Sequence, residues 1–230
     1  MVLDKATLLG LLEKRHSVRR FSSLLLDNDE RERLYSLLSD LNQRGNTRLE
    51  AFVDEPSAFD CPAAKFMRFK HARNYVAFYV KKDDKAALVD AGEVGALLSL
   101  SLLSMGFGNC FVAGTFSRKQ SHAKPKDGEA LPFVLVFGHG ENEGKPHRNK
   151  KLTDLSKDYD GAPEWFQKGI EAIMLCPSSI NRFPYVFSLE NGEAVGRPRG
   201  DSLSFVDIGI AKFFFELASE GHPLTIKIQK

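Results

Sequence analysis

Four short stretches of the sequence carry groups that could bind a ligand. In the first, Arg15-His16-Ser17-Val18-Arg19, two guanidiniums and a hydroxyl occupy alternate positions. Alternate side chains of an extended segment project to one side, where they could hold a phosphate through bidentate, charge-assisted hydrogen bonds. A basic stretch of this length is more often a solvated surface, so both interpretations stay open at this point.

The second stretch is rich in glycine and runs from Gly106 to Phe116. Glycine lets the chain turn without steric cost, so the backbone amides of Ala113 and Gly114 could approach a flat ligand. The simpler interpretation is the end of a helix followed by a turn. It is not a dinucleotide-binding fingerprint, because the glycines follow a predicted helix and precede a predicted strand, the reverse of the required order.

The third and fourth stretches lie in the second part of the chain. The third contains Ser178, Ser179 and Asn181 between prolines, and these neutral hydrogen-bonding groups suit a heterocycle better than a nucleophilic role. A serine-rich helix end is the alternative. The fourth contains Arg148 and Lys150 and could bind an anion or form a charged linker.

The hydrophobic pattern predicts the elements that must position these stretches. Two long apolar helices are expected to open with the same D-x-G pattern, at Asp90-Ala91-Gly92 and at Asp207-Ile208-Gly209, and to close at a glycine. This self-similarity indicates a partial internal repeat. The other expected elements are helices capped at Asp4 and Asp27 and one after Pro163, with strands over 75–80, 111–113, 132–137, 185–189 and 224–228.

Composition excludes several classes of protein. The 230 residues include 32 Lys and Arg against 30 Asp and Glu, and a net charge of +2 is too small for binding to nucleic acid or an anionic membrane surface. The three cysteines form no C-x-x-C pair, so no disulfide framework or zinc site is expected. No secretory signal is apparent at Met1, and the apolar run Val94–Phe107 is expected to be a buried helix, so the protein is predicted to be cytoplasmic.

The four stretches together resemble the FMN-dependent nitroreductase family, which opens with R-[RH]-S-x-[RK]-x-F and carries D-x-G at the start of its long helix. The resemblance covers nearly the whole chain. The matching positions are Arg15, His16, Ser17, Arg19, Phe21, Asp90, Gly92, Gly106, Gly108, Gly114, Pro132 and Gly138. It implies an α+β, nitroreductase-like fold, with a central antiparallel or mixed sheet flanked by helices around a buried central helix.

The main departure from the family concerns its P-S-S-x-N motif. Leu41–Arg44 occupies the expected place, and the motif occurs instead at Pro177–Asn181, with Tyr185 in place of the family's Trp after the proline. Family homodimers build each flavin site from R-x-S of one subunit and P-S-S-x-N of the other. The chain therefore resembles the TM nitroreductase branch, in which one chain mimics the dimer, with residues 1–152 as a first half and 153–230 as a shortened second half in one compact unit.

The resemblance also implies roles for the candidate residues. Arg15, Ser17, Arg148 and Lys150 would hold the FMN phosphate and ribityl chain, with His16 in the same motif. Arg19 would lie near the pyrimidine edge, the amide of Ala113 beside Gly114 would face N5, and the ring would contact Ser178, Ser179 and Asn181. No catalytic side chain and no metal ligand is assigned.

The reaction implied by the resemblance is hydride transfer from NAD(P)H through FMN to a nitroaromatic or quinone, a small-molecule acceptor. Two alternatives stay open: a flavin-binding module for sensing or storage without turnover, and a structural relative that binds no flavin. The chain is expected to be a monomer that acts as a pseudo-dimer, with a further homodimer possible. The basic loop Arg118–Lys126 could contact the NADPH phosphate, although a solvated loop is the preferred interpretation.

Overall fold

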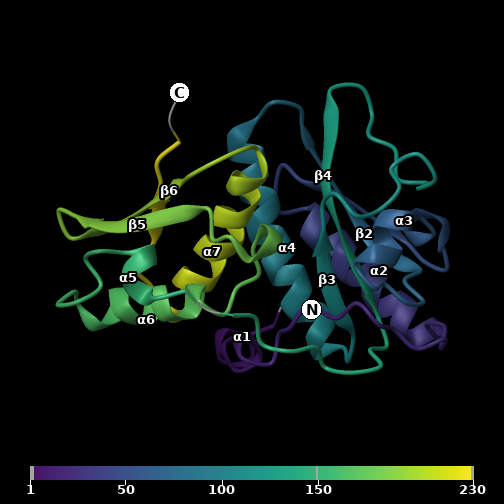
Figure 1. Cartoon of the computed structure of the whole chain (residues 1–230), viewed down its shortest axis with the longest axis horizontal. Helices are drawn as coiled ribbons and strands as arrows, with labels where there is room; N and C mark the ends of the chain where they lie inside the picture. The colour runs from purple at the N-terminus through teal and green to yellow at the C-terminus, as the bar shows by residue number, and fades with distance from the viewer. Residues whose placement is uncertain (1–2, 149, 229–230) are drawn as a thin grey trace. The chain divides into compact units, whose positions relative to one another are not determined.

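The computed structural model describes residues 3–148 and 150–228, which fall into two compact units (Figure 1). Unit 1 comprises Met1–Leu3, Lys14–Asp84 and Leu98–Pro146, and unit 2 comprises Asp4–Glu13, Lys85–Leu97 and His147–Lys230. One helix, α4 (Lys85–Ser104), contributes residues to both units. The division into residues 1–152 and 153–230 that the sequence suggested describes an internal duplication, not these compact units. That division stays a prediction.

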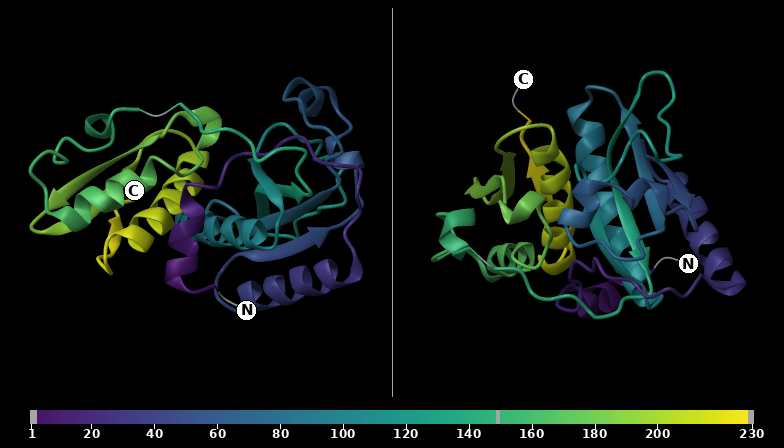
Figure 2. Two further views of the ribbon diagram at one scale, coloured as in Figure 1. Left: turned by 90° about the horizontal axis from the view of Figure 1, so that it is seen from below. Right: turned by 45° about the vertical axis from the view of Figure 1, so that its right-hand side comes forward.

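Unit 1 is built on an antiparallel sheet of four strands in the order β1-β2-β4-β3. Every residue of β2 except the last is buried, as expected for an apolar strand covered on both faces. The left view of Figure 2 shows α2 running along this sheet. The bounds are β1 (Arg48–Phe52), β2 (Asn74–Lys81), β3 (Gly108–Val112), β4 (Glu129–Gly138), α2 (Asn28–Asn42), α3 (Pro62–Phe66) and the 3-10 turn η1 (Ser57–Phe59).

Unit 2 consists of helices packed with a mixed sheet of three strands in the order β5-β6-β7. Helix α7 packs against α6, α1 and the β5–β6 hairpin, as Figure 1 shows for the hairpin and α6. The bounds are α1 (Lys5–Leu12), α5 (Leu152–Leu155), α6 (Glu164–Ile173), α7 (Leu203–Ala218), the 3-10 turn η2 (Ser179–Asn181), β5 (Tyr185–Glu190), β6 (Glu193–Pro198) and β7 (Leu224–Ile226).

Within unit 2, α4 and α7 cross at the glycines of their D-x-G patterns. A Cβ atom added at Gly92 would lie 2.2 Å from the Val206 carbonyl oxygen, and one added at Gly209 would lie 2.0 Å from the Val89 carbonyl oxygen. Gly92 thus faces the carbonyl of the residue three positions before Gly209, and Gly209 faces the carbonyl of the residue three positions before Gly92. This reciprocity is the form of contact that a two-fold axis produces between identical helices. The ion pair of Lys212 with Glu93, at 2.7 Å, lies one turn from the crossing.

Several sequence predictions are confirmed and others need correction. The α+β class is confirmed, and Asp4 and Asp27 cap α1 and α2 as predicted, the second in a full capping box with Glu30. The D-x-G patterns lie inside their helices, because the residues before them also favour helix, so the prediction that they open the helices was wrong. Strands β1 and β6 were not predicted.

Helix α4 is the one described helix that is long and apolar enough to cross a membrane by length and composition. In the structure 61% of its most apolar 18-residue stretch is buried within the protein, and the core helices of soluble proteins pass the same test. Its buried residues include Ala91, Ala96 and Leu100, each with no exposed surface. The predicted buried helix is therefore present, although it starts at Lys85 rather than at Asp90.

Candidate functional site

The first candidate segment, Arg15–Phe21, is held in unit 1 by backbone pairing. Ser17 forms a parallel bridge with Asn109 of β3, and the Val18 amide donates to the Asn109 carbonyl at 2.9 Å. The Asn109 side chain is itself buried and fixed by two hydrogen bonds with Ser99. These bonds leave the segment extended against the sheet edge, as the alternation of Arg15, Ser17 and Arg19 requires.

The cationic groups of this segment are partly withdrawn from water. Arg15 is 3% exposed and Arg19 is half-buried, and the Nε of Arg19 is buried without a hydrogen-bond partner among the described residues. Burial raises the pKa of the Cys110 thiol, and the nearby Arg19, the Ser17 hydroxyl and Arg15 act against that shift. Positive charge and hydrogen-bonding groups therefore lie beside Asn109 and Cys110 of β3, while the half-buried His16 lies close to the backbone of Gly144.

The residues that follow β3 form an open edge of unit 1. A Cβ added at Gly114 would meet no atom within 4 Å, so a flat ligand could approach the backbone there. The Arg118 side chain donates to the carbonyl of Ala113 at 3.1 Å and to those of Leu131 and Pro132. Desolvation lowers the pKa of Arg118. Arg118 is exposed, in line with the predicted solvated loop, and its guanidinium also fixes the backbone beside Ala113.

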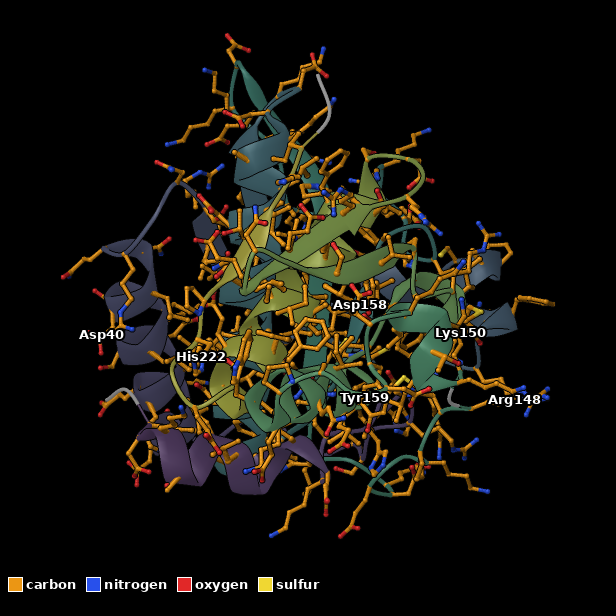
Figure 3. All side chains as sticks on the ribbon, turned by 90° about the vertical axis from the view of Figure 1, so that its left-hand side faces the viewer. Asp40, Arg148, Lys150, Asp158, Tyr159 and His222 are labelled. Carbon is orange, nitrogen blue, oxygen red and sulfur yellow. The ribbon has the colours of Figure 1, made fainter. Side chains whose placement is uncertain are left out.

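In unit 2 the structure brings the five other candidate residues together around one loop, Pro177–Pro184. The Asn181 side-chain amide donates to the Arg148 carbonyl at 2.7 Å, and the Lys150 ammonium donates to the Arg182 carbonyl. Figure 3 shows the Arg148 side chain extending away from the ribbon. Arg148 and Lys150 are exposed, so their charges can reach a ligand beside the loop.

The Pro177–Pro184 loop has an uncommon backbone conformation. Ile180, Asn181 and Phe183 have φ angles of 46°, 57° and 50°, in the left-handed region that few residues other than glycine adopt. For a β-branched residue such as Ile180 this conformation is strained, and its side chain is 73% exposed rather than packed. Such strain persists only where the surroundings impose it, and it is concentrated at functional sites.

Hydrogen bonds impose this conformation on the loop. The Ser179 amide donates to both carboxylate oxygens of Asp207, at 3.1 and 3.0 Å, and its hydroxyl donates to Oδ1 at 3.2 Å. The Phe183 amide donates to the Ser178 hydroxyl at 3.1 Å. Desolvation raises the pKa of Asp207 to about 6, against the opposing effect of the Ser179 bonds. The sequence identified Asp207 as part of a helix pattern and missed this role, for which the D-x-G repeat was the available signal.

The candidate residues thus form two groups, one in each unit. Arg15, His16, Ser17, Arg19, Ala113 and Gly114 lie in unit 1, while Arg148, Lys150, Ser178, Ser179 and Asn181 lie in unit 2. Within residues 3–148 and 150–228, no group of three His, Cys, Asp or Glu side chains is placed to hold a metal ion. Cationic groups are therefore present in both groups, together with the Ser17 hydroxyl in unit 1 and hydroxyl and amide groups in unit 2.

The chain with this α+β fold matches a nitroreductase family over most of its length. The family model described as "Putative TM nitroreductase" matches residues 7–219, and the chain belongs to this family. No curated protein matches the chain.

Solved structures agree with this fold. The crystal structure of "a putative nitroreductase" from Thermotoga maritima has a TM-score of 0.64 and 20% identity, with 95% of this chain and 84% of that chain covered. A "putative NADH dehydrogenase/NAD(P)H nitroreductase" from Bacteroides thetaiotaomicron has a TM-score of 0.51 and 18% identity, with 68% of this chain and 99% of that chain covered. A third, from Exiguobacterium sibiricum and in complex with FMN, has a TM-score of 0.51 and 14% identity, covering 67% and 96%. The predicted nitroreductase-like fold is confirmed.

Proposed function

We propose that this protein binds FMN and transfers a hydride from NAD(P)H, through the flavin, to a nitroaromatic or quinone acceptor. Membership of the nitroreductase family supports an oxidoreductase, and a protein of the same fold is described as crystallised with FMN. The observation that carries the proposal is the Arg15–Arg19 segment, which pairs with β3 at Ser17 and Val18. In this segment the buried Nε of Arg19 has no hydrogen-bond partner among residues 3–148 and 150–228. A buried guanidinium nitrogen without a protein acceptor suits an anionic ligand.

The residues present fit both the phosphate and the flat, polar-edged ring of FMN. Arg15 and Ser17 offer charge-assisted hydrogen bonds for the phosphate, and Arg19 offers positive charge for the polar edge of the ring. The open backbone at Gly114 accommodates a flat group, and Arg118 keeps the adjacent Ala113 in place. When bound, the flavin supplies the hydride chemistry, while the protein supplies binding, orientation and charge.

The decisive experiment is to purify the protein, quantify the extracted flavin and measure NAD(P)H oxidation with a nitroarene and with a quinone. Bound FMN and turnover are expected. Flavin binding without turnover would instead indicate a sensing or storage module. A colourless protein that FMN does not titrate would indicate a structural relative and would overturn the proposal.

Arg19→Met tests the assignment of the cationic segment. Loss of one charge-assisted hydrogen bond, worth about 2 kcal/mol, should weaken FMN binding about 30-fold in a fluorescence titration of the apoprotein. The stability of the apoprotein should not fall, because the removed Nε has no partner among the described residues. Arg20→Met is the matched control, since the neighbouring Arg20 is exposed and paired with Glu141 at 3.0 Å. Equal FMN affinity in both variants would reject the role of Arg19.

We also propose that one chain binds one FMN and acts as a pseudo-dimer. Two observations support this. Gly92 and Gly209 make a reciprocal contact. In addition, two nitroreductase structures are matched over nearly their whole length but cover only about two thirds of this chain. Flavin quantified per chain, with the mass in solution measured by light scattering, tests it. Two flavins per chain would contradict the proposal.

A further inference from the structure

The Asp207 carboxylate is buried and directed at the strained loop. It is 4% exposed, although it lies in the second turn of α7, and it accepts all three of its described hydrogen bonds from Ser179. Burying a carboxylate costs free energy, which here is offset by bonds to one residue of the loop. Ile180 and Asn181, which come next in the loop, have left-handed φ angles, as does Phe183.

We propose that Asp207 is a positioning residue, whose carboxylate fixes Ser179 and thereby holds the Pro177–Pro184 loop in the conformation that presents Ser178 and Asn181 to the flavin. The inference rests on the proposed FMN binding. The Ser178 hydroxyl accepts the Phe183 amide and keeps its own proton to donate. The Asn181 amide nitrogen bonds the Arg148 carbonyl, so its oxygen is the group that can accept from a ligand.

A carboxylate suits this role better than an amide. The Ser179 amide donates to both Asp207 oxygens, whereas an asparagine offers one oxygen and would place an NH₂ group against one of these donors. Protonation of Asp207 similarly removes acceptor capacity. The charged and titratable groups near Asp207 are Asp201, before α7, and Tyr185 of β5, whose hydroxyl contacts Cys176.

The experiment measures FMN affinity of the apoprotein by flavin fluorescence for the wild type, Asp207→Asn, Asp207→Ala and Asp158→Asn. The Asp158 carboxylate also accepts a backbone amide, that of Leu189 at 2.9 Å, but it holds β5 rather than the loop, so it is the matched control (Figure 3). At pH 7.5 we expect about 5-fold weaker binding for Asp207→Asn, at least about 10-fold for Asp207→Ala, and a change below about 2-fold for Asp158→Asn.

The pH profile separates positioning from a general structural effect. The affinity ratio of wild type to Asp207→Asn should fall towards one between pH 7.5 and pH 5, as the wild-type carboxylate becomes protonated. Protonation of the FMN phosphate affects both proteins and cancels in the ratio. Amide exchange at Ser179 without FMN is a second measurement, and it should be faster in Asp207→Asn.

The outcomes distinguish this proposal from the proposed function. Two outcomes overturn only the role of Asp207. One is that the wild type binds FMN no better than Asp207→Asn at pH 7.5, and the other is that the affinity ratio does not change with pH. A wild-type protein that fails to bind FMN overturns both proposals. Because Asp207→Asn is nearly isosteric, misfolding of Asp207→Ala would leave the test intact.

Discussion

Helices α4 and α7 contain the same D-x-G pattern and use it differently. Their glycines are equivalent, since Gly92 and Gly209 each lie against the backbone of the other helix. Their aspartates are not equivalent: Asp207 is buried and holds Ser179, whereas Asp90 is half-buried on the other helix. Both glycines are required where the two helices cross, and the Asp207 carboxylate in addition holds Ser179 of the P-S-S-x-N loop.

The corresponding region of the first part of the chain has a structural role. Leu41–Arg44, where the family's motif would be expected, lies at the end of α2. The Asn42 side chain donates to the Leu49 carbonyl at 3.0 Å and accepts the Leu49 amide at 2.7 Å, which ties α2 to β1. The packing requirement for a glycine is therefore shared by α4 and α7. The contact with the loop of the proposed flavin site is made by Asp207 of α7.

The largest effect is expected for the shared glycines. Gly92→Ala and Gly209→Ala should each lower the free energy of unfolding by about 3 kcal/mol or more, because the new methyl group would overlap a backbone oxygen that cannot move aside. Urea denaturation measures this. Gly10→Ala is the control, since Gly10 lies inside α1 with no atom near a Cβ, and it should stabilise the protein by about 0.5–1 kcal/mol. A large effect at only one of the two glycines would break their equivalence.

A smaller effect is expected from Asp207, whose burial should make the free energy of unfolding depend on pH. The pKa of Asp207 is about 6 in the folded protein against 3.8 as its ordinary value, so the folded state binds this proton more tightly than the unfolded state. The associated stability is fully present below about pH 4 and is lost as the pH rises through about 6. The loss amounts to about 2–3 kcal/mol for a shift of about two pKa units.

Urea denaturation of wild type and Asp207→Asn between pH 4 and pH 8 measures that dependence. The difference between the two proteins isolates Asp207 from other groups that titrate in this range. A difference that does not change with pH would show that burial does not disfavour the ionised carboxylate, and Asp207 would then resemble any exposed aspartate.

Local sequence signals predicted much of the fold but not the contacts that shape the loop. Capping residues and apolar periodicity located α1 and α2, because these signals act within a few residues. Strand β1 was missed because Arg48 and Glu50 are charged, and Arg48 is held there by an ion pair with Glu129, 81 residues away. Strand β6 was missed because its Gly196 and Pro198 are typical of turns.

The candidate site shows the same limit. The motifs identified residues that gather at one edge of unit 1 and around one loop of unit 2, because family resemblance carries information that local physics lacks. The role of Asp207 depends on a bond across 28 residues of sequence, and nothing in the type of residue 180 indicates a left-handed backbone. Both features follow from tertiary contacts that override local preference.

The smallest predicted effect tests whether the loop is strained while Asp207 holds it. Ile180→Asn should raise the free energy of unfolding by about 1 kcal/mol, because asparagine adopts the left-handed conformation more readily than a β-branched residue. Little burial is lost, since the Ile180 side chain is 73% exposed. Ile180→Val keeps the branched side chain and should give no gain. If Asn and Val behave alike, the backbone at residue 180 is not strained in solution, and the loop needs no carboxylate to hold it.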